Sequence, residues 1–129
     1  MYLSGRTQPM AEYPILECLD RIAAVGFEGV EICLENEDLA PATLDAALAR
    51  KVGEHARDLG LAPSVSYHKD YIFHDTAFEE TCKAIRLTPE FGADVFVFAG
   101  RRKRDEPDEW ARMIERTREL AKLAEECGV

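Results

Sequence analysis

The sequence is poor in the residues from which small metal-bound or disulfide-bonded domains are built. Only four of its 129 residues are cysteines, Cys18, Cys33, Cys82 and Cys127, and no two of them form a C-x-x-C pair. Scattered cysteines are typical of buried thiols in a reducing compartment, whereas a zinc site or a disulfide framework needs a regular spacing. We therefore expect free thiols and a cytoplasmic protein.

Long apolar runs and positive charge are also scarce. No apolar stretch approaches the roughly 18 residues of a membrane span, and the N-terminus lacks the basic and apolar regions of a signal peptide. Sixteen Lys and Arg against 25 Asp and Glu give a formal net charge of -9, which repels nucleic acid and anionic lipid over most of the surface. We expect a soluble protein with no nucleic-acid or membrane partner.

What the sequence does contain is a repeat marked by four glycines. Gly26, Gly60, Gly92 and Gly128 each follow a helix-like stretch and precede an apolar residue, and they recur every 32 to 36 residues. A glycine at such a point ends a helix in the left-handed conformation. The period is that of one strand followed by one helix. The sequence therefore predicts four βα units.

The four expected helices are amphipathic, so each should cover one face of a sheet. The first begins near Pro14, and the other three cover about 43–59, 76–89 and 107–127. A capping box at Thr76–Glu79 should open the third helix. In the fourth, Trp110 and Ile114 should face the core together with Leu120.

The four expected strands cover about 2–4, 29–35, 62–68 and 93–99. Helices between successive strands force parallel pairing. Apolar and polar residues alternate within 29–35 and 62–68, whereas a sheet covered on both faces reads as a continuous apolar run. The pattern favours an α/β fold of about four parallel (β/α) units forming half of a TIM barrel. We expect residues 1–129 to be its N-terminal half, with the C-terminal half absent from this sequence.

Three segments support a resemblance to a known family. They are Gly26–Glu31 after the first helix, Ser64–His68 at the end of the third strand, and Gly92–Gly100 around the fourth. They resemble the xylose isomerase-like TIM barrel superfamily of sugar and sugar-phosphate isomerases and epimerases. The resemblance implies a divalent metal, Mn, Mg or Co, whose ligands lie on later strands and therefore outside this chain. A fragment without them should be inactive by itself.

His68 is the candidate catalytic residue. It ends a strand in the inward, polar series, and the catalytic groups of such barrels lie at the carboxyl ends of strands. Its imidazole can hydrogen-bond a substrate hydroxyl or donate a proton near pH 7; the alternative is a structural histidine held by a neighbour. His74 follows in the next loop, but two imidazoles are a poor metal site, and we predict no metal ligands here.

Glu35 and Arg101 are candidate substrate-binding residues. Glu35 lies near the catalytic end of its strand, where a substrate contact and a solvated carboxylate are equally open, whereas Glu31 on the same face favours a structural ion pair. Arg101 begins a basic cluster, 101–104, that follows the fourth strand and can bind a phosphate, unless the cluster is simply solvated. Ala99 stands where endonuclease-type relatives carry a metal-binding histidine, which disfavours an endonuclease.

These features together predict part of a metal-dependent isomerase or epimerase. It would act on a small-molecule sugar or sugar phosphate by moving a proton between adjacent carbons through an enediolate. A dehydratase on the same barrel is one alternative. The other is a non-catalytic α/β binding module, either flavodoxin-like or self-associating, and open sheet edges predict a homodimer.

Overall fold

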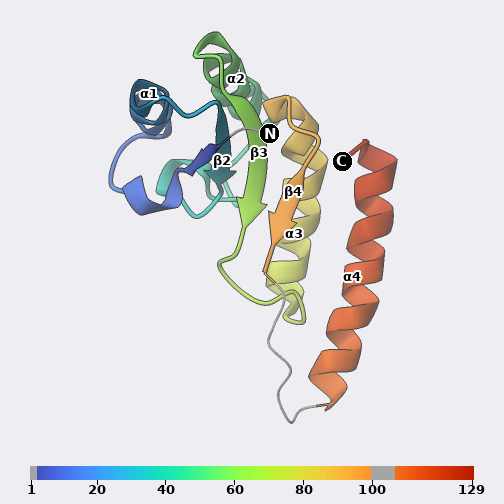
Figure 1. The fold of residues 1–129 in the computed structure, drawn as a ribbon. Helices are drawn as coiled ribbons and strands as arrows, with labels where there is room; N and C mark the ends of the chain where they lie inside the picture. Colours follow the sequence, from blue (N-terminus) through green and yellow to red (C-terminus); the bar gives the residue numbers. More distant parts are fainter. Residues whose placement is uncertain (1–2, 100–106) are drawn as a thin grey trace.

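The computed structural model describes residues 3–99 and 107–129. Its centre is one parallel sheet of four strands in the order β1-β2-β3-β4 (Figure 1). The strands are β1 (Ser4–Arg6), β2 (Gly29–Cys33), β3 (Ala62–Tyr67) and β4 (Phe96–Phe98). Each strand pairs with the next along the chain, as in Ser4 with Gly29 and Val65 with Phe96. The predicted α/β fold of four parallel units is confirmed.

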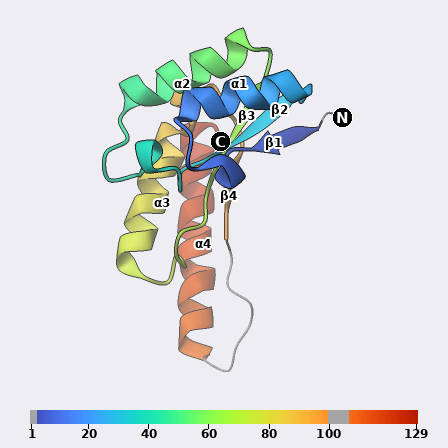
Figure 2. The ribbon, with the colours of Figure 1, turned by 90° about the vertical axis from the view of Figure 1, so that its left-hand side faces the viewer.

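Each strand is followed by a helix. The helices are α1 (Ile15–Val25), α2 (Ala46–Asp58), α3 (Asp75–Leu87) and α4 (Pro107–Cys127), with short 3-10 turns η1 (Gln8–Met10), η2 (Glu37–Leu39) and η3 (Thr88–Phe91). Helix α1 packs against α2, and α3 packs against α4 (Figure 2). Chain order and spatial order therefore agree in both the sheet and its helical cover.

The four repeat glycines close the units as predicted. Gly26, Gly60, Gly92 and Gly128 all have positive φ, between 73° and 94°. A residue with a Cβ is strained in this conformation, which explains why glycine stands at each point.

The side chains of β2 and β3 divide between two faces. Val30, Ile32 and Val65 are fully buried on the helix side, where they meet Leu19 of α1 and Val52 of α2. The alternate residues carry polar groups to the opposite face. The alternation read from the sequence is thus the real division between core and polar face.

The capping box predicted at Thr76–Glu79 is wrong. Helix α3 already begins at Asp75, so Thr76 lies inside it, and the N-cap residue His74 makes no side-chain capping bond. Asp75 instead bonds Arg112 and Arg116 of α4. The first residue of α3 thus contacts α4, and the predicted local capping pattern is absent.

The inward face predicted for α4 is also wrong in its first half. Trp110 and Ile114 are 38% and 37% exposed, whereas Met113 is only 6% exposed and Leu120 is buried as expected. The first turns of α4 extend beyond the sheet (Figure 1). The neighbour that decides which side is buried there is α3, and it selects the stripe of Met113 and Leu120.

Candidate functional site

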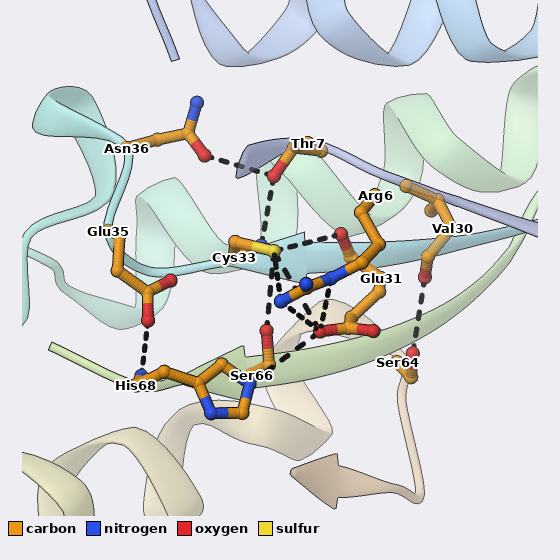
Figure 3. Close-up of polar contacts among 10 residues, drawn as sticks. All are labelled: Arg6, Thr7, Val30, Glu31, Cys33, Glu35, Asn36, Ser64, Ser66 and His68. Carbon is orange, nitrogen blue, oxygen red and sulfur yellow. Dashed lines mark hydrogen bonds and ion pairs between the residues drawn. The ribbon is translucent and has the colours of Figure 1, made fainter. Parts of the chain in front are cut away.

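Polar side chains from three strands gather on the face of the sheet opposite the helices (Figure 3). Alternate residues of a strand point to the same side, and the strands are parallel and in register, so these residues become neighbours. We call this group the polar face; it comprises Arg6 of β1, Glu31 and Cys33 of β2, Ser66 of β3, and His68 just after β3.

Glu31 is the centre of the polar face. Its Oε1 accepts a hydrogen bond from Nε of Arg6 at 3.0 Å and lies 3.8 Å from Nε2 of His68. Glu31 therefore links β1, β2 and the end of β3. The structural ion pair predicted for Glu31 is present, and its partner is Arg6.

Arg6 is the site residue that sequence reasoning missed. The opening strand was expected at residues 2–4, whereas β1 covers Ser4–Arg6, because Ser-Gly-Arg has little strand propensity of its own. Burial alone would lower the pKa of Arg6, but the neighbouring Cys33 and Glu31 raise it by a larger amount. The pKa is therefore raised overall, and Arg6 stays cationic. The only sequence signal was an arginine two residues beyond the expected strand.

Cys33 is buried within the polar face. Ser66 Oγ donates to its sulfur at 3.3 Å, and Nη2 of Arg6 lies 3.8 Å from the sulfur. The backbone N–H of Cys33 donates to Thr7 Oγ1 at 2.9 Å, and that hydroxyl donates to Oδ1 of Asn36 at 2.9 Å. Because Thr7 and Asn36 are fully buried, this network fixes the ends of β1 and β2 relative to each other.

Glu35 and His68 are brought together, as their positions at strand ends suggested. The backbone N–H of His68 donates to Oε1 of Glu35. Oε2 of Glu35 is buried and meets no hydrogen-bond donor among residues 3–99 and 107–129. Glu35 thus braces the end of β3 through one oxygen and keeps acceptor capacity on the other.

The imidazole of His68 is held on the polar face, with its side chain 23% exposed. His74 is not part of this group. It lies 3.9 Å from Asp70 and packs against the ring of Phe73 with a centroid separation of 4.2 Å. The two histidines therefore lie in different environments and do not form one site.

The described residues do not fit a divalent metal. Within 3–99 and 107–129, no group of three or more His, Cys, Asp or Glu side chains is arranged to hold an ion. Glu31 and His68 come close, but the carboxylate of Glu31 is already engaged by the Arg6 cation. The expectation that metal ligands lie outside this chain stays a prediction.

Two further predictions concern the basic cluster and the absence of a membrane span. Arg101 and the rest of the basic cluster, 101–104, lie outside the described residues. Among the described helices, none combines the length and apolar character needed to cross a membrane.

Solved structures similar to this chain are sugar-converting enzymes and a dehydratase. D-psicose 3-epimerase from Clostridium cellulolyticum, solved with D-tagatose, superposes with a TM-score of 0.77 at 16% identity; the match covers 100% of this chain and 50% of that one. A sugar phosphate isomerase/epimerase from Parabacteroides distasonis gives 0.66 at 19% identity, with coverages of 98% and 48%. The probable 3-DHS dehydratase AsbF from Bacillus anthracis gives 0.74 at 16%, with 100% and 50%.

These likenesses show the fold, which is half of a TIM barrel. The chain spans about half the length of each solved structure that it matches. A search of curated proteins finds no significant match. The family model for the xylose isomerase-like TIM barrel matches residues 19–129, and the chain therefore belongs to that family.

Proposed function

We propose that this chain contributes the substrate-positioning half of an isomerase or epimerase acting on a sugar or sugar phosphate. Residues 1–129 would form the N-terminal half of the barrel. The observation that carries the proposal is the hydrogen bond from the backbone N–H of His68 to Glu35, which links the ends of two strands next to the Arg6–Glu31 ion pair. The matched epimerase structures, one of them solved with D-tagatose, support the substrate class.

His68 would contact the substrate directly. Its backbone is braced by Glu35 and its ring lies 3.8 Å from Glu31, so the imidazole can present a ring nitrogen to a hydroxyl without a large loss of side-chain freedom. A neutral imidazole donates through one nitrogen and accepts through the other, which suits a group that orients a hydroxyl or moves its proton.

Glu35 would accept a hydrogen bond from a substrate hydroxyl. A buried carboxylate oxygen without a donor costs free energy, and a side-chain movement that brings it to a sugar hydroxyl on binding would remove that cost. Arg101 would bind the phosphate of a phosphorylated substrate, since a guanidinium forms two parallel hydrogen bonds with a phosphate. The remaining groups of the reaction, including the metal ligands, would come from outside these residues.

A dehydratase is the second candidate function. The match to the probable 3-DHS dehydratase is of the same quality as the match to the epimerases. The two candidates therefore differ in which ligand would engage the strand ends at Glu35 and His68.

The test is a titration of isotopically labelled protein followed by NMR. With D-tagatose, D-fructose and a ketose phosphate, we expect weak binding, with Kd on the order of 1–10 mM, and shifts at the amides around Glu35 and His68. His68→Gln should abolish these shifts. His55→Gln is the matched control, because His55 pairs with Asp20 between α2 and α1, away from the polar face.

Three further outcomes decide between the candidates. Arg101→Ala should weaken the ketose phosphate while leaving the neutral sugar unchanged, and Lys51→Ala on the exposed side of α2 should change neither. Preferential binding of 3-DHS would favour the dehydratase. Absence of shifts at both strand ends with every ligand at about 100 mM, well above a millimolar Kd, would contradict the proposal.

A further inference from the structure

Both outer edges of the sheet lack a strand partner within the described residues. The order β1-β2-β3-β4 leaves β1 and β4 at opposite edges (Figure 1). On β1, the carbonyl of Leu3 and the N–H of Thr7 bond β2. Because alternate residues of a parallel strand bond alternate sides, the backbone groups of Ser4 and Arg6 point outward. Such an edge is a template for another strand.

The β1 edge is bordered by an apolar groove. The groove encloses about 440 Å³ and is lined by Pro9 and Met10 after β1, by Ile22 and Val25 of α1, and by Phe27 before β2. Val25 is 76% exposed. The charged residues that line the groove are Arg6 and Arg21, both cations.

The β4 edge is apolar as well. Val95 and Val97 are 50% and 39% exposed. Exposed apolar side chains of this size next to an unpaired strand are costly in water and mark an interaction surface. Asp94, at the start of this edge, lines the neighbouring hollow under α4. Both edges thus carry exposed apolar side chains.

We propose that a second copy of this chain covers both edges at once. A two-fold axis places β1 of each copy beside β4 of the other, in parallel, and lays α4 of each copy over the β1 groove of the other. One partner then satisfies both edges, and the symmetry limits the assembly to two chains. The dimer has eight parallel strands, the number that closes a TIM barrel. One copy matches half of a solved barrel structure, so two copies together have the length of a whole one.

Closure would also cover the candidate site. In an isolated chain, the polar face around Glu31 and His68 has the sheet on one side only. In the closed dimer, the polar faces of the two copies line one interior, so each would be covered by the other. The inference concerns association of the 129-residue chain and requires neither sugar binding nor turnover, so its failure is distinguishable from failure of the proposed function.

The first measurement is mass in solution by size-exclusion chromatography with light scattering. At about 100 μM, well above a micromolar Kd, we expect twice the chain mass with no larger species. A monomer at this concentration would overturn the proposal. A series of growing oligomers would also overturn it, because an open, non-closing contact produces such a series.

Matched variants then locate the interface. Ser4→Pro removes one outward N–H at the exposed start of β1, whereas Ser4→Ala keeps it. Loss of that donor should raise the dimer Kd about tenfold at each seam, hence about 100-fold for two seams. Equal Kd values for the two variants would overturn β1 pairing, provided that circular dichroism shows both to be folded.

A charge pair tests the groove independently. Val25→Glu places a carboxylate in the apolar groove, whereas Ala24→Glu places one next to it on the exposed side of α1. We expect the first to raise the dimer Kd at least tenfold and the second to leave it nearly unchanged. An equal response to the two substitutions would place the interface elsewhere and overturn the proposal.

Discussion

The first three βα units are held together mainly by apolar packing, whereas the fourth depends more on polar contacts. In the first three, one continuous core joins the sheet to α1, α2 and η3, and residues such as Leu19, Ile32 and Phe91 are fully buried. In the fourth, a smaller cluster of Ile72, Ile85, Met113 and Leu120 lies under α3 and α4. A hollow of about 270 Å³ separates α4 from β4. The same repeat therefore yields one tightly packed region and one loosely attached helix.

Polar contacts compensate for part of this difference. Arg116 of α4 donates to the backbone carbonyl of Ile72 at 2.8 Å, bonds Asp75, and lies over the ring of Phe78 at 4.6 Å. Arg112 adds a second contact to Asp75 at 2.6 Å. The attachment of α4 thus depends on charged groups at one end of α3, whereas α1 and α2 depend on apolar packing.

The largest effect should come from a substitution in the tightly packed region. A Cβ at Gly53 of α2 would lie 2.2 Å from the backbone oxygen of Phe91, and a backbone atom cannot rotate away. We expect Gly53→Ala to lower the free energy of unfolding by about 3 kcal/mol, even though alanine favours a helix by about 1 kcal/mol. Urea unfolding measures this. Glu54→Ala, at the next exposed position, is the control and should be close to neutral; equal stability of the two variants would mean that α2 and η3 are not in close contact.

A smaller effect is expected from the polar attachment of α4. Arg116→Ala leaves the carbonyl of Ile72 without its donor and removes the contact with Phe78, which should cost about 2 kcal/mol. The loss should be local, so amides of α4 should exchange faster with solvent while those of α2 stay protected. Arg112→Ala, which removes only an exposed ion pair, should have much less effect. Faster exchange throughout the chain would show that α4 is part of the main cooperative unit.

The sequence predicted the two regions with unequal success, for the same physical reason. In the first three units, apolar periodicity and the repeat glycines predicted the buried faces and the helix ends, because burial in one continuous core is what these patterns encode. Helix α3 ends at Leu87 and gives way to η3 at Thr88, close to the expected end at 89. In the fourth unit the pattern misassigned Trp110 and Ile114, because a helix that extends beyond the sheet has no core on one side to decide its orientation.

The candidate site was predicted only in part. His68 and Glu35 were selected because they end strands in the polar series; the structure joins them by one hydrogen bond, and their functional roles stay predictions. Arg6 was missed because its strand is three residues long and is formed by pairing with β2 rather than by its own sequence. The link from Thr7 to Asn36 was also beyond sequence reasoning, since it joins residues that come together only when β1 and β2 pair.

The smallest expected effect is a pH dependence confined to the loosely attached region. A hydrogen bond from Arg116 and the charge of Arg112 lower the pKa of Asp75 below its ordinary value of 3.8. A lowered pKa in the folded state means that this contribution to stability is complete above the ordinary value. It is lost as the pH falls through the lowered value. Helix α4 should therefore loosen as the pH falls below 3.8, before the main core unfolds.

Trp110 is the only tryptophan and lies on α4, so its fluorescence reports on this helix. As the pH falls from 6, we expect no change above the ordinary pKa of 3.8 and, below it, a fluorescence change that precedes the loss of helical circular dichroism. In Asp75→Asn the change should already be present at pH 6 and should vary little with pH. Asp58→Asn, on exposed α2, should behave as the unmodified chain. If fluorescence and circular dichroism coincided in all three proteins, α4 would be coupled to the main core more strongly than its packing indicates, and the contrast between the two regions would not hold.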